Sequence, residues 1–315
     1  MMRTSLRGRD SILVIVGPRC GTAVAPATVR ELLGPDVRAC WATRSGEATD
    51  LAGRFGVEHS TICVFGGDGT VSEVINGLWQ IAAESALAIF PAGTSNVLAC
   101  HFGCPTFRAA VCAASDGEGI PLNVAELVSD DGRTRLAALS LSTGAMAAAC
   151  ILANSLRWLG QKRIEVGQLF SRSTNGEYRV SIEDDQKTVA HGWHYSLSHV
   201  GQRAFGTRLL PVYLPSDRPF VVTQTLLRRS RTGLLRPDPI RHRGLPSDQE
   251  ATSGEGFGDR FYHVARDLRL EHEDDSPVCV DGDLWTSGCF QARVRTSLVR
   301  VLVPRDVCLL QDGGE

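Results

Sequence analysis

One short stretch, VFGGDGTVSEV at residues 64–74, constrains the fold of this chain more than any other. An apolar run leads into it, and apolar residues then recur every third or fourth position, which is typical of a strand followed by a helix. Gly66, Gly67 and Gly69 permit a sharp turn that residues with a Cβ atom would resist. Because such a turn gathers backbone N–H groups at a helix N-terminus, the stretch predicts an anion-binding site.

The polar residues of this turn have separate expected roles. Asp68 would repel a phosphate placed against it, so we interpret it as a group that orients a metal ion or a hydroxyl beside a nucleotide. Thr70 is expected to cap the helix and to offer its hydroxyl to a phosphate oxygen. The alternative is an ordinary strand-to-helix turn with a capping side chain, which requires only one or two glycines. The sequence contains no GxxxxGK[ST] phosphate loop.

A second stretch, PAGTSN at residues 91–96, follows the next predicted strand. Gly93, Thr94 and Asn96 again stand where a helix would begin. The carboxyl ends of neighbouring parallel strands meet at one sheet edge, and open α/β folds bind their ligands at that edge. The two turns together therefore predict a nucleotide-binding cleft.

The first part of the chain alternates between strands and helices. Short apolar or β-branched runs predict the strands, and the segments between them have helical spacing. The predicted strands are 11–16, 37–43, 60–65 and 86–90, and the predicted helices are 24–33, 46–55 and 71–83. This alternation predicts an α/β nucleotide-binding domain at residues 1–118, with a parallel sheet covered on both faces.

From residue 119 to 315 the pattern predicts a mainly β domain with an antiparallel sheet and one helix at 145–159. The predicted strands are 135–142, 178–183, 193–200, 220–225, 262–270, 291–295 and 298–303. Residues 226–259 are rich in Arg, Pro and Gly and are predicted to form a long loop. Its arginines leave two interpretations open, a solvated or disordered excursion or a local contact with a membrane or an anionic ligand.

Composition excludes some classes of function. Apolar residues at 43% and charged residues at 22% are ordinary for a globular protein, and a formal net charge of -2 gives no general attraction to nucleic acid. No window approaches the roughly 20 apolar residues of a membrane span, and the basic start lacks the core of a signal peptide, so we expect a cytoplasmic location. The ten cysteines include no CxxC pair, and we interpret them as reduced core residues.

Four motifs resemble those of the diacylglycerol kinase and sphingosine kinase family of lipid kinases, especially its soluble bacterial members. They are GGDGTVSEVINGL at 66–78, PAGTSNVLA at 91–99, ILVIVGPRCG at 12–21 and VDGDL at 280–284. The resemblance implies an α/β domain and a β-sandwich domain with the nucleotide between them. It also implies Mg2+-dependent transfer of the γ-phosphate of ATP to a hydroxyl of a diacylglycerol-like or sphingoid lipid at a membrane surface.

The resemblance assigns roles residue by residue. The residues expected to hold the nucleotide are Thr43, Gly66, Gly67, Asp68, Gly69, Thr70, Glu73, Gly93, Thr94 and Asn96. Asp283 matches the catalytic base of the family, a glutamate one methylene longer, and Asp281 is the neighbouring candidate. We count Asp68 with Asp283 as catalytic, while an Asp-Gly turn is the alternative for 281–283. A structural Mg2+ would take one carboxylate and backbone carbonyls at Asp217, Leu214 and Pro219.

Besides Asp283, three further positions depart from the family pattern. Gly17 stands where the family has Asn, Met146 where it has an acid, and Ser216 in place of one acid of the metal-binding turn. Two functions therefore stay open beside the lipid kinase. One is a nucleotide-binding protein that has lost catalysis and acts through partners, and the other is a kinase of a soluble substrate, since NAD kinases and phosphofructokinases share a GGDG turn. Peripheral contact with the inner membrane face and a homodimer are both compatible with the sequence.

Overall fold

The chain folds into two compact units. Unit 1 comprises Met1–Asn123 and Thr296–Glu315, and unit 2 comprises Val124–Arg295. The sequence predicted a single division at residue 118, with residues 296–315 in the second domain. In the structure these last residues belong to unit 1. The computed structural model describes residues 12–20, 24–156, 159, 166, 177–182, 185–191, 195–198, 203–204, 207–208, 220–225, 227–229, 235–237, 260–265, 267–272 and 277–305.

Unit 1 is built on a parallel sheet. Its central strands are β1 (Ile12–Val16), β3 (Thr61–Gly66) and β4 (Ala86–Pro91). At one edge β2 (Arg38–Trp41) pairs with β1, and at the other the end of β20 (Phe290–Val303) pairs with β4, both in parallel. β1 is buried along its whole length, as a strand covered on both faces must be. The predicted α/β domain is confirmed.

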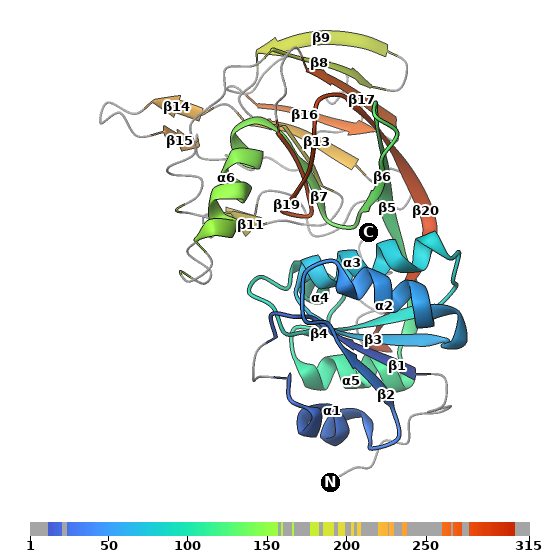
Figure 1. The fold of residues 1–315 in the computed structure, drawn as a ribbon. Coiled ribbons are helices and arrows are strands. Elements are labelled where there is room, and N and C mark those ends of the chain that lie inside the picture. Colours follow the sequence, from blue (N-terminus) through green and yellow to red (C-terminus); the bar gives the residue numbers. More distant parts are fainter. Residues whose placement is uncertain are drawn as a thin grey trace. The chain divides into compact units, whose positions relative to one another are not determined.

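Helices cover both faces of this sheet (Figure 1). α2 and α3 pack against each other on one face, while α1 and α5 lie on the other. The bounds are α1 (Pro26–Leu33), α2 (Glu47–Phe55), the 3-10 helix η3 (Gly56–Glu58), α3 (Asp68–Gln80), α4 (Val97–His101) and α5 (Phe107–Asp116). Among the helices that the structure describes, none has the length and hydropathy required to cross a bilayer.

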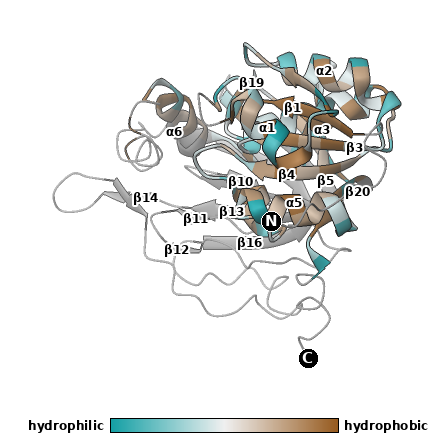
Figure 2. Ribbon diagram, turned by 90° about the horizontal axis from the view of Figure 1, so that it is seen from below, coloured by the Kyte–Doolittle hydropathy of each residue, from teal (hydrophilic) through white to brown (hydrophobic). Residues whose placement is uncertain are grey.

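Aromatic side chains fill the core of unit 1 between β3, β4 and α5. Phe65 and Phe90 stack with their ring centroids 4.1 Å apart, and Phe107 meets Phe65 edge-on. In Figure 2 the strands β1, β3 and β4 are coloured as mainly hydrophobic. This packing fixes the carboxyl ends of β3 and β4, from which both glycine turns begin.

Unit 2 is mainly antiparallel and carries one long helix, α6 (Gly144–Ser155), which packs on β18. One sheet has the order β16-β13-β10-β7-β18-β19, and β17, β8 and β9 pair in that order beside β20. The bounds are β5 (Glu118–Ser129), β6 (Thr134–Ala137), β7 (Ser140–Ser142), β8 (Glu177–Ile182), β9 (Asp185–His191), β10 (Tyr195–Ser198), β11 (Arg203–Ala204), β12 (Thr207–Arg208), β13 (Phe220–Thr225), β14 (Leu227–Arg229), β15 (Leu235–Pro237), β16 (Arg260–Ala265), β17 (Asp267–His272), β18 (Pro277–Val280) and β19 (Asp283–Ser287). The predicted β-rich second part is confirmed.

Several elements of unit 2 differ from the sequence prediction. Residues 135–142 divide into β6 and β7, and residues 262–270 divide into β16 and β17, with the two members of each pair in different sheets. In contrast, 291–295 and 298–303 belong to the single strand β20. Within 226–259, β14 and β15 pair as an antiparallel ribbon, and the rest of that segment lies outside the described residues.

Burial separates the described cysteines, and the expectation that the cysteines are core residues is wrong for Cys100 and Cys112, which are exposed. Desolvation by burial raises the pKa of Cys63 and of Cys279 to about 12, whereas Cys112 is exposed. We therefore expect iodoacetamide at neutral pH to modify Cys112 and to leave Cys63 and Cys279 intact in the folded protein, since the thiolate is the nucleophile. Peptide mass spectrometry would measure this, and equal rates at Cys63 and Cys112 would contradict the buried position of Cys63.

Candidate functional site

The two glycine turns touch each other at the carboxyl ends of β3 and β4. These strands pair in register up to Gly66 and Pro91, so the turns begin side by side. A Cβ atom added to Gly93 would lie 2.3 Å from the Cα of Gly67, which leaves no room for a side chain. The N–H of Ala92 donates to the carbonyl of Gly66 at 3.0 Å. The structure thus brings together the two stretches that the sequence singled out.

Asp68 links the two turns directly. It is the first residue of α3, and its Oδ1 and Oδ2 accept the N–H groups of Leu98 and Val97 at 2.9 and 3.1 Å. These N–H groups belong to the first turn of α4, where a carboxylate also complements the positive end of the helix. No pattern in the sequence indicates this positioning contact. The orientation of a metal ion by Asp68 stays a prediction.

Asn96 closes the second turn onto Gly93. Its Oδ1 accepts the N–H of Gly93 at 2.8 Å, and its Nδ2 donates to the carbonyl of Gly93 at 2.9 Å. The backbone of Asn96 is left-handed, with φ of 48°, a conformation that Asn adopts more readily than most residues. Thr94 is exposed between the two ends of the turn. Asn96 therefore shapes the turn, while Thr94 lies where a ligand can approach it.

Thr70 packs against two glycines. A Cβ atom at Gly17 would lie 2.3 Å from Thr70 Oγ1, and one at Gly66 would lie 2.5 Å from Thr70 Cβ. The Asn of the family pattern at position 17 would therefore require Thr70 to move, which gives this departure a physical reason. The predicted capping of the helix by Thr70 is wrong, because Gly67 is the N-cap residue and Thr70 lies inside the first turn of α3.

Residues of the loop after β2 form hydrogen bonds with Glu47, at the start of α2, and with Glu73 on α3. Glu47 Oε2 accepts the N–H of Thr43 at 2.6 Å and its hydroxyl at 2.8 Å, and these bonds lower the pKa of Glu47. Ser45 Oγ donates to Glu73 Oε1 at 3.1 Å. Glu73 Oε2 is buried and has no hydrogen-bond partner among the residues that the structure describes. One carboxylate oxygen of the predicted nucleotide site is therefore left unsatisfied by the described part of the chain.

The N-terminus of α3 offers what a phosphate group requires. The first N–H groups of a helix have no intrahelical acceptor and carry the positive end of the helix dipole. Gly67 and Gly69 add no side chains at this helix end, and the Asp68 carboxylate is held by the N–H groups of α4. The arrangement fits the polyphosphate of a nucleotide.

In unit 2, Asp281 occupies the turn between β18 and β19. Asp281 and Gly282 have φ of 53° and 85°, and two positive values are typical of a tight β-hairpin turn. The Asp281 carboxylate accepts three backbone N–H groups, those of Ala138, Leu139 and Ser140, at 2.9, 2.8 and 2.9 Å. This contact bends the chain between β6 and β7 and explains why residues 135–142 are not one strand.

Asp283 begins β19 and has a different environment. Its Oδ1 lies 3.4 Å from Asn154 Nδ2, which also donates to the carbonyl of Gly282 at 2.9 Å. Because the Asp281 carboxylate is committed to three backbone amides, the geometry favours Asp283 over Asp281 as a base. The catalytic role of Asp283 stays a prediction.

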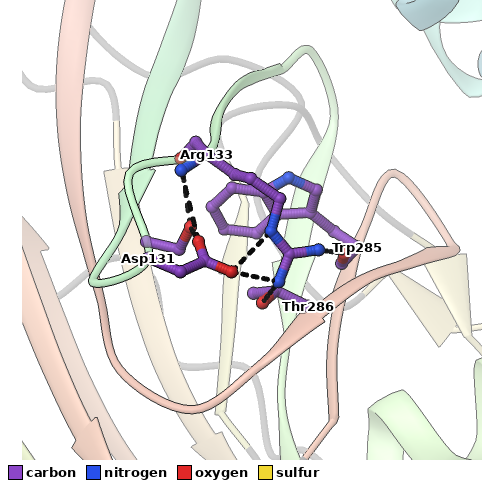
Figure 3. Close-up of polar contacts among 5 residues, drawn as sticks. Asp131, Arg133, Trp285 and Thr286 are labelled. Atoms are coloured by element: carbon purple, nitrogen blue, oxygen red, sulfur yellow. Dashed lines mark hydrogen bonds and ion pairs between the residues drawn. The ribbon is translucent and has the colours of Figure 1, made fainter.

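An arginine anchors β19 to the turn between β5 and β6 (Figure 3). Arg133 Nη2 donates to Thr286 Oγ1 at 2.6 Å and Nη1 to the carbonyl of Trp285 at 3.3 Å. Its Nε donates to Asp131 Oδ2 at 2.7 Å, and the hydrogen bonds from Arg133 hold the pKa of Asp131 well below its usual range. The strand that begins with Asp283 is thus held along its length as well as at the turn.

The predicted structural metal site, Leu214, Asp217 and Pro219, lies outside the described residues, as does Ser216. Met146 falls in α6. Across the described part of the chain, no group of three or more His, Cys, Asp or Glu side chains is placed to hold a metal ion.

The contacts of Asp68 predict a loss of stability on substitution. Asp68→Asn keeps the shape of the side chain but leaves one oxygen acceptor for the two N–H groups of Val97 and Leu98. Since a hydrogen bond to a charged group contributes about 1.5–3 kcal/mol, we expect the free energy of unfolding to fall by about 2 kcal/mol in urea titrations. An unchanged urea midpoint would show that the Asp68 contact does not hold α4 in place.

Several known proteins are similar in sequence to this chain. Residues 11–127 match the diacylglycerol kinase catalytic domain. A diacylglycerol kinase of Mycobacterium tuberculosis (strain H37Rv) is 30% identical over 220 residues, which are 66% of this chain and 69% of that protein. A probable YegS-like lipid kinase of Pseudomonas aeruginosa is 32% identical over 128 residues, 38% of this chain and 41% of the relative, so this match spans well under two thirds of the relative's length.

Solved structures extend the likeness to nearly the whole chain. A putative diacylglycerol kinase from Bacillus anthracis str. Sterne superposes with a TM-score of 0.69 and covers 94% of this chain and 98% of its own. A second diacylglycerol kinase structure from the same organism gives a TM-score of 0.64 with 95% and 98% coverage. Both are 18% identical in sequence, so the likeness shows a shared fold.

Proposed function

Because this chain belongs to the diacylglycerol kinase family, we propose that it is an ATP-dependent lipid kinase. It transfers the γ-phosphate of ATP to a hydroxyl of a diacylglycerol-like or sphingoid lipid at a membrane surface, with Mg2+ as the metal ion. The observation that carries the proposal is the contact of the two glycine turns, where Gly67 and Gly93 approach too closely for any side chain. This contact sets the second turn beside the N-terminus of α3, so two glycine-containing turns meet at the sheet edge where α/β folds bind phosphates.

The nucleotide is bound by backbone more than by side chains in this proposal. The first N–H groups of α3 donate to phosphate oxygens, and the contact of Gly67 with Gly93 holds the second turn beside those groups. Asp68 keeps the second turn in place through Val97 and Leu98 while the anion binds. Mg2+ neutralises charge on the phosphates when bound, and it commonly takes most of its ligands from phosphate and water.

Asp283 acts as the base toward the lipid in this proposal. Its carboxylate takes the proton of the acceptor hydroxyl as that oxygen forms a bond to the γ-phosphorus. The bond between the γ-phosphorus and the bridging oxygen breaks, and ADP leaves with that oxygen. The three backbone amides that hold Asp281 leave this role to its neighbour.

The proposal is tested by incubating the purified protein with ATP labelled at the γ-phosphate and mixed bacterial lipids. We expect labelled phospholipid in the presence of Mg2+. A parallel reaction with NAD as acceptor separates a lipid kinase from a kinase of a soluble substrate. No labelled lipid under any Mg2+ or Mn2+ condition would contradict the proposal, and ATP binding by calorimetry without turnover would then indicate a nucleotide-binding protein.

A further inference from the structure

The end of helix α6 reaches the hairpin that carries Asp283. Asn154, next to last in this helix, donates its Nδ2 to the carbonyl of Gly282 at 2.9 Å and lies 3.4 Å from Asp283 Oδ1. We propose that Asn154 is a positioning residue that fixes the orientation of the Asp283 carboxylate toward the acceptor hydroxyl. The inference rests on the proposed function, because it concerns the carboxylate assigned there as the base.

The chemistry of the two partners fixes the orientation of the Asn154 amide. A backbone carbonyl and an ionised carboxylate are both acceptors, so the amide nitrogen rather than the amide oxygen must face them. The nitrogen carries two protons and can donate one to Gly282 and one to Asp283. A single side chain therefore ties the carboxylate of Asp283 to the backbone of the turn before it.

Asn154 itself is held in a defined place. Helix α6 packs on β18, where Cys279 Sγ donates to the carbonyl of Ala147 at 3.5 Å, and Ala147 and Ala153 are buried. On the other side of the turn, Asp281 is anchored by its three N–H donors. The backbone of the hairpin is thus fixed from two sides, and Asn154 acts on the Asp283 side chain, whose rotation sets the direction of its carboxylate.

Orientation matters for the rate because a base must lie within hydrogen-bond reach of the proton that it takes. An aspartate has a shorter side chain than the glutamate of the family pattern, and it has fewer rotamers with which to recover a lost hydrogen-bond distance. A misplacement of about 1 Å at a reacting group costs on the order of 100-fold in rate. A donor that holds one oxygen of Asp283 therefore influences the chemical step more than ATP binding.

The first test replaces Asn154 by Leu, which has a similar shape and no donor. We expect kcat for lipid phosphorylation to fall about 10–100-fold, since orientation of the base is lost, while the KM for ATP stays within about twofold. Ser155→Ala is the matched control at the same helix end, because Ser155 Oγ donates to the carbonyl of Ile151 within α6, at 3.5 Å. A wild-type kcat for Asn154→Leu beside an inactive Asp283→Asn would overturn the inference and leave the proposed function intact.

A double substitution separates positioning from a general structural role. If Asn154 acts through Asp283, the variant Asn154→Leu with Asp283→Asn should be as slow as Asp283→Asn alone. A residue that merely supports the fold would lower the remaining rate further. Additive losses would therefore overturn the inference.

A nuclear magnetic resonance readout tests the contact without any catalysis. The side-chain amide signal of Asn154 is assigned by its loss in Asn154→Leu, and we expect it to shift in Asp283→Ala and to stay in place in Ser155→Ala. An Asn154 amide that does not respond to the loss of Asp283 would overturn the inference whatever the kinase assay gives. A shifted amide in a protein that phosphorylates no lipid would contradict the proposed function and support the contact between Asn154 and Asp283.

Discussion

Replacing Asp283 by Asn is expected to lower kcat for lipid phosphorylation by about 100- to 10,000-fold, the range that a general base contributes. The amide keeps the shape of the carboxylate, and one oxygen can still accept from Asn154, so the hairpin should fold as before. Initial rates at saturating ATP measure the loss, and the KM for ATP should change little because the nucleotide is bound by the glycine turns. A kcat within a factor of about three of the wild type would remove Asp283 from the chemistry.

Asp281→Asn is the matched control for this prediction, two residues away in the same turn. Its carboxylate holds the N–H groups of Ala138, Leu139 and Ser140, so the expected effect is on stability. Loss of a charged hydrogen-bond acceptor should lower the free energy of unfolding by about 1.5–3 kcal/mol. The reverse pattern, a stable but inactive Asp281→Asn beside a fully active Asp283→Asn, would exchange the roles of the two residues.

The sequence predicted those parts of the site that depend on neighbours along the chain. The glycines between β3 and α3, and between β4 and the helix after it, mark turns by their local conformational freedom. The parallel pairing of β3 with β4 follows from the strand-helix alternation, and it brings Gly67 to Gly93. For these elements, local spacing and the rules of α/β sheets were sufficient to predict both the turns and the pairing of the strands.

The contacts that hold the site join residues far apart in the sequence, and no local pattern indicates them. Asp68 accepts from residues 97 and 98, and Asp281 accepts from residues 138–140. An aspartate in a glycine turn is equally compatible with metal binding, helix capping or a bond to a distant backbone amide. Only the fold decides between these uses, which is why Asp68 was assigned from charge and not from its acceptors. The division of residues 135–142 into two strands was missed for the same reason.

The last prediction concerns Gly93, where one added methyl group should disrupt nucleotide binding. In Gly93→Ala the new Cβ would lie 2.3 Å from the Cα and 2.8 Å from the N of Gly67, and 2.9 Å from Asn96 Oδ1. Backbone atoms cannot rotate away as a side chain can, so the two turns must separate. Overpacking of this kind costs about 1–3 kcal/mol, and we expect a fall in ATP affinity of about 10- to 100-fold by isothermal titration calorimetry.

Gly53→Ala is the control for a methyl group added to a glycine of the same unit. Gly53 lies in α2, and its Cβ would meet only the carbonyl of Gly77 at 3.7 Å, an ordinary van der Waals distance. Because Ala favours a helix interior by about 0.5–1 kcal/mol over Gly, this variant should be at least as stable as the wild type and bind ATP equally well. If Gly93→Ala also bound ATP as the wild type does, the phosphates would have to be bound away from the contact of the two turns, and the assignment of that contact as the nucleotide site would be wrong.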